Sequence, residues 1–294
     1  MAFAVQDQPR AVIVISSHVV RGTVGNRAMV FALETLGFPV WAVPTITLPW
    51  HPGHGKATRI VPPAKEFAAL LKDLEGARWL GEVAAVISGY LADAGQAQAI
   101  SSLVTAVKRK NPAAIYLCDP VIGDQGGLYV PGDVAAAQRD RLLPLADIAT
   151  PNRYELEWLT GAKLDTPDAV AEAALDASPP TMLVTSSPAF MARGTGNILV
   201  TPEAAMMAEH RLIDNPPNGP GDLTGAVFLA RLLDGHELQS ALQLTTESVF
   251  EILARTAKRG ADELTLETDA QSLSHPMAMV QTRFLTYPGG GRRA

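Results

Sequence analysis

Short, nearly continuous apolar runs recur along the chain, and longer segments with one apolar face separate them. The runs are rich in Val, Ile and Leu, as is typical of strands covered on both faces. They predict strands at Ala11–Ile15, Pro39–Val43, Val83–Ile87, Ala114–Cys118 and Thr181–Thr185, with a further strand near Ile148. Apolar residues at helical spacing predict helices at Val24–Leu36, Ala64–Leu74, Gln96–Lys110, Asp222–Leu233 and Leu238–Lys258.

Strands that alternate with helices in this way form parallel sheets joined by right-handed helical crossovers. The expected fold class is therefore α/β, a three-layer α/β/α sandwich with a mostly parallel central sheet. No Ser/Gly-rich linker, composition shift or long repeat divides the sequence. We expect one domain over residues 1–288 and a short tail from Gly289 to Ala294.

Composition and charge exclude several classes of protein. The chain has 24 Lys and Arg against 30 Asp and Glu, and the net charge of −6 argues against a broad nucleic-acid surface. The single Cys118 excludes an internal disulfide framework and a structural zinc cluster of thiols. No apolar stretch is long enough to span a membrane, and Met1 to Arg10 lacks the pattern of a signal peptide. We expect a cytoplasmic protein without a membrane partner.

Ligands of such sheets bind outside the carboxyl ends of the strands, so polar residues that follow strands are candidates. The strongest segment is Asn218-Gly219-Pro220-Gly221-Asp222, directly before a predicted helix. Its glycines allow close backbone approach, and the helix directs free N–H groups at the loop, which suits a phosphoryl group. Asp222 could accept a proton there from an attacking hydroxyl. The alternative is a glycine-rich turn in which Asp222 caps the helix.

Carboxylates and hydroxyls follow four other strands. Asp119 comes directly after a strand, where it suits Mg²⁺ or forms an Asp-Pro turn. Asn152 and Glu155, three residues apart, could reach a metal-water shell together or form a capping box. Asp124 and Tyr129 belong to a glycine-rich loop that could cover a nucleotide. Hydroxyl groups after two further strands could bind substrate or phosphate, or simply end the strands; they are those of Ser17, Thr185 and Ser186.

Several other motifs are weak or absent. His51 and His54 have a spacing compatible with a metal, but no third ligand is nearby. Gly55-Lys56-Ala57 does not form a P-loop, because Ala stands where Ser or Thr is required. A G-x-G-x-x-G motif after the first strand and a G-x-S-x-G elbow are both missing from the sequence, which weakens dehydrogenase and α/β-hydrolase interpretations.

Taken in order, these segments resemble the ribokinase-like superfamily and, within it, the pyridoxal kinases. The resemblance extends from about Ala11 into the final helices, which is most of the chain. The segments that carry it are Ser16–Ala28, Cys118–Asp124, Ala146–Asn152 with Glu155, and Gly219–Asp222.

The resemblance implies ATP-dependent phosphorylation of the 5′-hydroxymethyl group of pyridoxal, or of pyridoxine and pyridoxamine. It also implies Mg²⁺ bound with ATP, a monovalent cation such as K⁺, and a homodimer. Ser17 and Tyr90 would contact the pyridine ring of the substrate. Gly219 and Gly221 would form the anion hole, with Asp222 as the catalytic base that also touches the substrate.

The resemblance assigns the nucleotide to a second set of residues. Within this set, Asp119 and Glu155 would order Mg²⁺ through waters. The full set is Asp119, Asp124, Tyr129, Asn152, Glu155, Thr185, Ser186 and Gly221. Two positions depart from the family pattern: Pro220 replaces a common Thr or Ala and removes one backbone donor, and Pro52 replaces a Thr that contacts substrate in many members.

Two rival functions remain open from the sequence. A hydroxymethylpyrimidine kinase of the same superfamily usually has a Gly-Gly segment where this chain has Ser16-Ser17-His18. A non-catalytic protein that binds B6 vitamers is the other rival. The presence of Asp222, Asp119 and Glu155 together argues against it.

Overall fold

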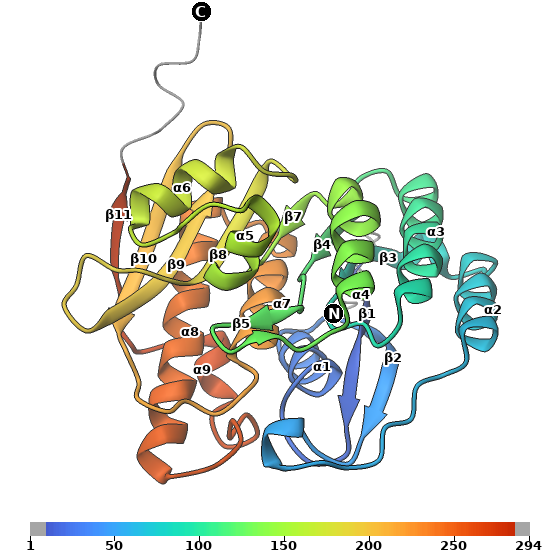
Figure 1. The fold of residues 1–294 in the computed structure, drawn as a ribbon, viewed down its shortest axis with the longest axis horizontal. Coiled ribbons are helices and arrows are strands. Elements are labelled where there is room, and N and C mark those ends of the chain that lie inside the picture. The colour runs from blue at the N-terminus through green and yellow to red at the C-terminus, as the bar shows by residue number, and fades with distance from the viewer. Residues whose placement is uncertain (1–9, 286–294) are drawn as a thin grey trace, which may run out of the picture.

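The centre of the fold is one nine-stranded sheet, seen in a computed structural model that describes residues 10–285 (Figure 1). The strand order is β11-β10-β9-β8-β7-β4-β3-β1-β2. The six parallel strands are β1 (Ala11–Val19), β2 (Val40–Leu48), β3 (Val83–Ser88), β4 (Ile115–Cys118), β7 (Ile148–Ala149) and β8 (Thr181–Ser187). The antiparallel strands are β9 (Gly194–Val200), β10 (Ala205–Arg211) and β11 (Gln281–Phe284). The prediction of a mostly parallel sheet is confirmed.

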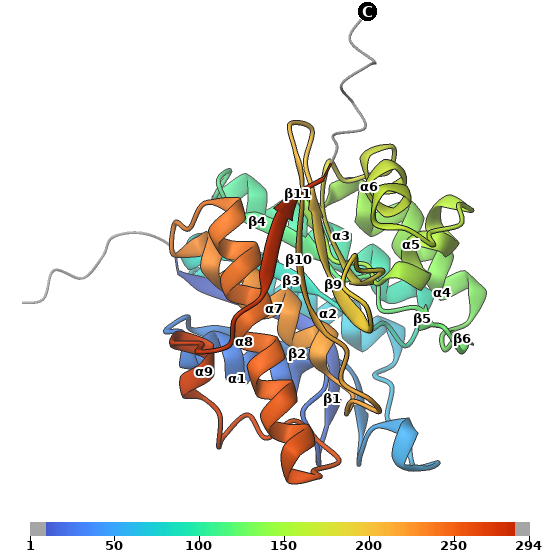
Figure 2. The ribbon, with the colours of Figure 1, turned by 90° about the vertical axis from the view of Figure 1, so that its left-hand side faces the viewer.

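Helices cover both faces of this sheet, as the edge-on view in Figure 2 shows. One layer holds α1 (Asn26–Thr35), α7 (Pro220–Leu233), α8 (Leu238–Arg259) and α9 (Gln271–Ser274). The other holds α2 (Ala64–Glu75), α3 (Ala94–Lys110), α4 (Gly132–Ala137), α5 (Arg153–Thr160) and α6 (Pro167–Leu175). Short 3-10 helices are η1 (Pro52–His54), η2 (Leu80–Glu82) and η4 (Leu143–Leu145), and η3 (Gln138–Leu142) is a short π-helix. A small hairpin joins β5 (Gly123–Asp124) to β6 (Gly127–Leu128). The three-layer α/β/α fold class is therefore confirmed.

The alternation of side chains along β1 explains why its sequence is apolar throughout. Val12 and Val14 pack into the apolar layer beneath α1, α7 and α8. Ile13 and Ile15 pack into the opposite layer, beneath α2 to α6. Successive side chains of a strand point to opposite faces, so a strand covered on both sides has no position for a polar residue in its centre.

The predicted elements are all present, although most of their ends differ by a few residues from the prediction. The strand predicted from Ala11 runs on to Val19, and α7 begins two residues before the predicted Asp222. The last strand predicted from the sequence is Thr181–Thr185, but β9, β10 and β11 also lie in the later part of the chain. β9 opens with Gly194-Thr195-Gly196, and every residue of β11 is exposed, so neither shows the apolar run that revealed the parallel strands.

The structure does not test two predictions about the extent of the domain. The tail expected at Gly289 to Ala294 lies outside the described residues. The assignment of residues 1–288 to one domain stays a prediction. Within the described part, no helix has both the length and the apolar character that crossing a bilayer requires.

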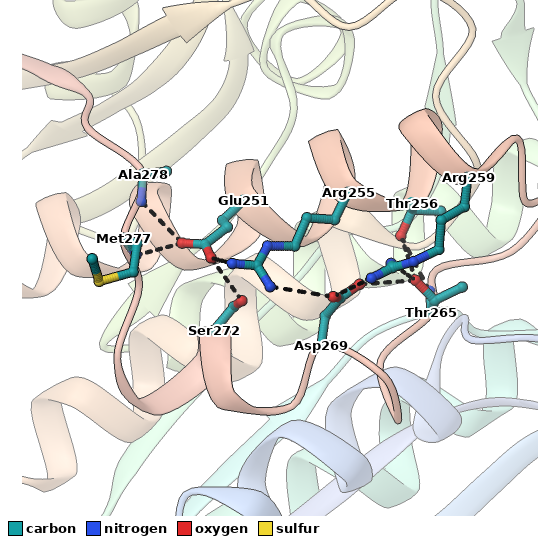
Figure 3. Close-up of polar contacts among 9 residues, drawn as sticks. All are labelled: Glu251, Arg255, Thr256, Arg259, Thr265, Asp269, Ser272, Met277 and Ala278. Carbon is teal, nitrogen blue, oxygen red and sulfur yellow. Dashed lines mark hydrogen bonds and ion pairs between the residues drawn. The ribbon is translucent and has the colours of Figure 1, made fainter.

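A polar network fastens α8 to the segment that leads into β11 (Figure 3). Asp269 is buried and accepts hydrogen bonds from Arg259 Nη2 at 2.8 Å and Thr265 Oγ1 at 2.9 Å. Glu251 accepts from Ser272 Oγ at 3.1 Å and from the backbone N–H of Ala278 at 2.9 Å. The Arg259 guanidinium and the other donors hold the pKa of Asp269 below its ordinary value. The network fixes α8, which forms one wall of the cleft described next.

Candidate active site

Every residue predicted to form a site lines one cleft of about 690 Å³. The cleft lies at the carboxyl edge of the parallel strands and also receives the N-terminus of α7. The predicted residues found in its wall are Ser17, Tyr90, Asp119, Asp124, Tyr129, Asn152, Glu155, Thr185, Ser186, Gly219, Gly221 and Asp222. The structure therefore brings together segments that are up to about 200 residues apart, while the chemical role of each stays a prediction.

Tyr90 is held at three points at one end of the cleft. Its backbone N–H donates to Ser16 Oγ at 3.2 Å, and its carbonyl accepts from Thr45 Oγ1 at 2.7 Å. Its hydroxyl accepts from Arg59 Nη2 at 2.9 Å. Ser17 follows Ser16 along β1 and lies against Gly25, whose φ of 56° and close contacts leave no space for a side chain. This end of the cleft is thus rigidly built.

The N-terminus of α7 points at the middle of the cleft. Gly219 is the N-cap residue with φ 105°, and a Cβ there would lie 2.3 Å from the carbonyl oxygen of Thr23. The Leu223 N–H makes a hydrogen bond of 3.0 Å to the Gly219 carbonyl. In an α-helix the N–H groups before this one have no partner within the helix, so those of Gly221 and Asp222 are available to an anion.

Asp222 does not cap this helix. No side-chain cap hydrogen bond is present at the start of α7, and Gly219 occupies the N-cap position. The alternative of Asp222 as a helix cap is therefore wrong. Pro220 is the first helical residue, where proline is favoured because the missing N–H removes no intrahelical hydrogen bond.

Burial and mutual repulsion raise the pKa values of the carboxylates in the cleft. Burial raises the pKa of Asp222 to about 6, partly offset by the Gly25 backbone N–H. Burial, and then the charge of Asp222, raise the pKa of Asp119 well above its ordinary value. Burial, and then the charge of Asp119, do the same for Glu155. Burial raises the pKa of the neighbouring Cys118 to about 12, so this thiol stays protonated and is not a nucleophile.

Asn152 and Glu155 form a capping box at the start of α5. Asn152 Oδ1 accepts from the Glu155 N–H at 2.9 Å, and Glu155 Oε2 accepts from the Asn152 N–H at 2.8 Å. The pair also holds the loop after β4, because Glu155 Oε1 accepts from the Ile122 N–H at 2.9 Å and Asn152 Nδ2 donates to the Gly123 carbonyl at 2.8 Å. Backbone donors engage both carboxylate oxygens of Glu155, so a metal ion would reach this side chain through water.

The donors around Asp119 fit Mg²⁺ bound together with phosphates. Among residues 10–285, no group of three or more His, Cys, Asp or Glu is arranged to hold a metal by itself. The buried Thr150 hydroxyl lies close enough to lower the pKa of Asp119, yet it lacks the geometry of a full hydrogen bond. Mg²⁺ keeps several waters and needs only one or two carboxylates besides phosphates. A cation here would also offset the repulsion between Asp119 and Asp222.

Positive charge is scarce in this cleft. Four carboxylates line it, those of Asp119, Asp124, Glu155 and Asp222. Within the described part of the chain, Arg59 is the single Lys or Arg in its wall, and it lies at the Tyr90 end. An anionic ligand in the middle of the cleft would therefore depend on backbone N–H groups and bound cations.

The apolar end of the cleft, beyond Thr185 and Ser186, was not predicted from the sequence. The rings of His210 and Phe250 stack there, with centroids 4.4 Å apart and an interplanar angle of 26°. Leu212, Val249 and Leu253 complete the wall. These side chains come from β10, the segment after it and α8, and no local motif links them. Arg59 at the opposite end was also missed, because it lies in an irregular loop, and His51, which was considered only as a metal ligand, lines the cleft there as well.

A three-layer fold whose cleft joins a helix N-terminus to several buried carboxylates is typical of small-molecule kinases of the ribokinase-like class. The family model described as phosphomethylpyrimidine kinase matches residues 64–267. The pyridoxal kinase PdxY of Rubrobacter xylanophilus is 39% identical over 269 residues, covering 89% of this chain and 93% of the relative. That of Corynebacterium diphtheriae is 34% identical, covering 89% and 95%.

Solved structures agree with these relatives. The pyridoxal kinase of Leishmania donovani in complex with ADP and pyridoxine superposes with a TM-score of 0.86 and 25% identity, covering 94% of this chain and 99% of that chain. Its complex with ADP and pyridoxamine gives a TM-score of 0.87. The chain belongs to the pyridoxal kinase family, and the ribokinase-like fold expected from the sequence is confirmed.

Gly219 and Gly221 should respond differently to alanine. Gly219→Ala places a Cβ against the Thr23 carbonyl at a positive φ, so the variant should lose thermal stability. Beyond its neighbours in the helix, a Cβ on Gly221 meets no atom of the protein within 4 Å, so Gly221→Ala should fold normally but narrow the space before the helix N-terminus. We expect a fall in kinase rate of about tenfold or more for Gly221→Ala, with an unchanged melting temperature. A wild-type rate in this variant would contradict close approach of a ligand at Gly221.

Proposed function

We propose that this chain transfers the γ-phosphoryl group of ATP to the 5′-hydroxymethyl group of pyridoxal, and of pyridoxine and pyridoxamine. One observation carries the proposal: Asp222, with a pKa of about 6, lies at the helix N-terminus whose free N–H groups face the same cleft. The names of the curated relatives and the ligands of the Leishmania donovani structures support this substrate class.

Asp222 acts as the general base in this proposal. A primary alcohol becomes a good nucleophile when a carboxylate within reach accepts its proton. A pKa of about 6 leaves Asp222 mostly ionised at neutral pH and more basic than an ordinary carboxylate. The N–H groups of Gly221 and Asp222 stabilise the charge that develops on the transferred phosphoryl group.

The nucleotide lies along the other part of the cleft, with its phosphates toward Asp119. We place the adenine ring of the nucleotide near the stacked rings of His210 and Phe250, because that wall is apolar and aromatic. Thr185 and Ser186 lie between this wall and the carboxylates and would contact phosphates. The β5–β6 hairpin, with Asp124 and Tyr129 in the cleft wall, would cover the phosphates.

Mg²⁺ would be held by Asp119 directly or through water, and by Glu155 and Asn152 through water. When bound, it supplies positive charge that neutralises the phosphates. This chain's own residues hold the alcohol, accept its proton at Asp222 and donate N–H groups at α7. The scarcity of Lys and Arg in the cleft wall supports the need for the cation.

The remaining family features are part of the same proposal. They are a monovalent cation such as K⁺, a homodimer and a location in the cytoplasm. Exposed apolar side chains support the homodimer: Val20 and Ile60 lie next to the last residues of β2, the strand at one edge of the sheet, and are 66% and 62% exposed.

Phosphorylation of hydroxymethylpyrimidine is the second candidate, because the matching family model carries the description of a related pyrimidine kinase, phosphomethylpyrimidine kinase. A panel of pyridoxal, pyridoxine, pyridoxamine and hydroxymethylpyrimidine with Mg·ATP separates the candidates. We expect ADP and the 5′-phosphates of the B6 vitamers in equal amounts, detected by chromatography. Turnover of hydroxymethylpyrimidine alone would contradict the proposal and favour the second candidate. Vitamer binding without ADP formation would indicate a non-catalytic binding protein.

The pH dependence of kcat/KM tests the base. Because the ionised form of Asp222 is required and its pKa is about 6, kcat/KM should fall about tenfold per pH unit below that value. Asp222→Asn cannot accept the proton, so its kcat should fall about 10²–10⁴-fold at neutral pH. Asp124→Asn is the control, because it alters another cleft carboxylate and should keep the acid limb where it is. A kcat of Asp222→Asn within about threefold of the wild-type value would show that Asp222 is not the general base.

A further inference from the structure

Arg59 has an unusual position for a charged residue of this cleft. It belongs to the irregular loop between η1 and α2 and is exposed. Its guanidinium Nη2 donates to the Tyr90 hydroxyl at 2.9 Å, and the residue lines the cleft beside Ser17 and His51. Every other Lys or Arg among residues 10–285 lies outside the cleft wall.

The partner of Arg59 is itself fixed. Ser16 Oγ and Thr45 Oγ1 bind the backbone of Tyr90 at 3.2 Å and 2.7 Å, so its ring leaves the sheet edge from an anchored position. An Arg that donates to an anchored hydroxyl has a defined place, although the residue is exposed. A guanidinium carries five N–H donors, and the contact with Tyr90 uses one of them.

The neighbouring groups leave Arg59 as the dominant charge at this end. Burial lowers the pKa of His51, with Glu263 acting in the opposite direction, and His51 Nδ1 accepts from the Gly53 N–H at 3.1 Å. His51 is therefore neutral at pH 7. Glu263 does not line the cleft, and its carboxylate contacts His54 Nε2 at 2.8 Å. The four carboxylates of the cleft wall belong to the middle, around Asp119 and Asp222.

We propose that Arg59 is a specificity-determining residue that disfavours vitamers with a cationic group on the 4′ carbon. The inference rests on the proposed function, in which Tyr90 and Ser17 contact the pyridine ring. Pyridoxine carries a 4′ hydroxymethyl group and pyridoxamine a 4′ aminomethyl group, which is an ammonium at neutral pH. The two substituents have nearly the same size, so a fixed guanidinium separates them by charge. The ring nitrogen and the 3-oxygen are common to both vitamers.

The size of the effect follows from Coulomb repulsion between two unit charges near solvent. At a separation of about 6–8 Å in a mostly aqueous environment, repulsion changes relative affinity about two- to tenfold. Salt screens exposed charges, so the discrimination should shrink as ionic strength rises.

The test compares kcat/KM for pyridoxine and pyridoxamine in matched variants. Arg59→Gln removes the charge and can still donate to Tyr90, so the pyridoxamine to pyridoxine ratio should rise about two- to tenfold. Arg59→Lys keeps the charge and should keep the wild-type ratio. Lys56→Gln removes a charge from the same loop outside the cleft wall, and it should also keep the ratio. The rise in Arg59→Gln should be smaller in high salt than in low salt.

The outcomes separate this inference from the proposed function. A wild type that phosphorylates neither vitamer refutes the proposed function, and the role of Arg59 with it. A wild type that phosphorylates both, with the same ratio in Arg59→Gln, overturns the role of Arg59 alone. If Arg59→Gln fails to fold by circular dichroism, Tyr90→Phe takes its place, because loss of the hydroxyl frees the guanidinium and should also raise the ratio; an unchanged ratio there overturns the inference.

Discussion

The gathering of buried carboxylates at the carboxyl edge of the sheet is the constraint on which the site depends. Burial raises the pKa of Asp119, Glu155 and Asp222; the charge of Asp222 adds to the rise at Asp119, and the charge of Asp119 adds to the rise at Glu155. No Lys or Arg of the described chain lies among them in the cleft wall. Burying such charges without compensation is costly. The compensation built into the chain consists of backbone N–H groups, at the start of α7 for an anion and at Ile122 and Asn152 for Glu155.

This arrangement assigns different work to carboxylates that are close in space. Glu155 is engaged by backbone donors and shapes the loop after β4, so it would reach a metal ion only through water. Asp119 follows β4 directly and shares its surroundings with the Thr150 hydroxyl, which suits an ion that arrives with phosphates. Burial raises the pKa of Asp222 to about 6, which suits the general base that we propose it to be. The environment, rather than the residue type, divides the roles.

The sequence could predict the parts of this site that follow buried strands or open helices. Asp119, Asn152 and Asp222 were found because apolar runs and glycine-rich turns are local patterns. Arg59 could not be found, since only the folded loop brings its guanidinium to Tyr90. The stack of His210 on Phe250 joins β10 to α8, 40 residues apart, and β10 lacks the uniform apolar run of the parallel strands. The true N-cap of α7 also depends on the contact between Gly219 and Thr23, which is distant in sequence.

Nucleotide binding with and without a divalent cation tests the central claim most directly. In a cleft with four carboxylates and one peripheral Arg, the phosphates of ADP meet net negative charge unless a cation comes with them. Calorimetric titration of the wild-type protein with ADP should therefore give an affinity at least about tenfold weaker in a chelator than with Mg²⁺. Equal affinity under the two conditions would contradict the account, because it would mean that the chain alone neutralises the phosphates.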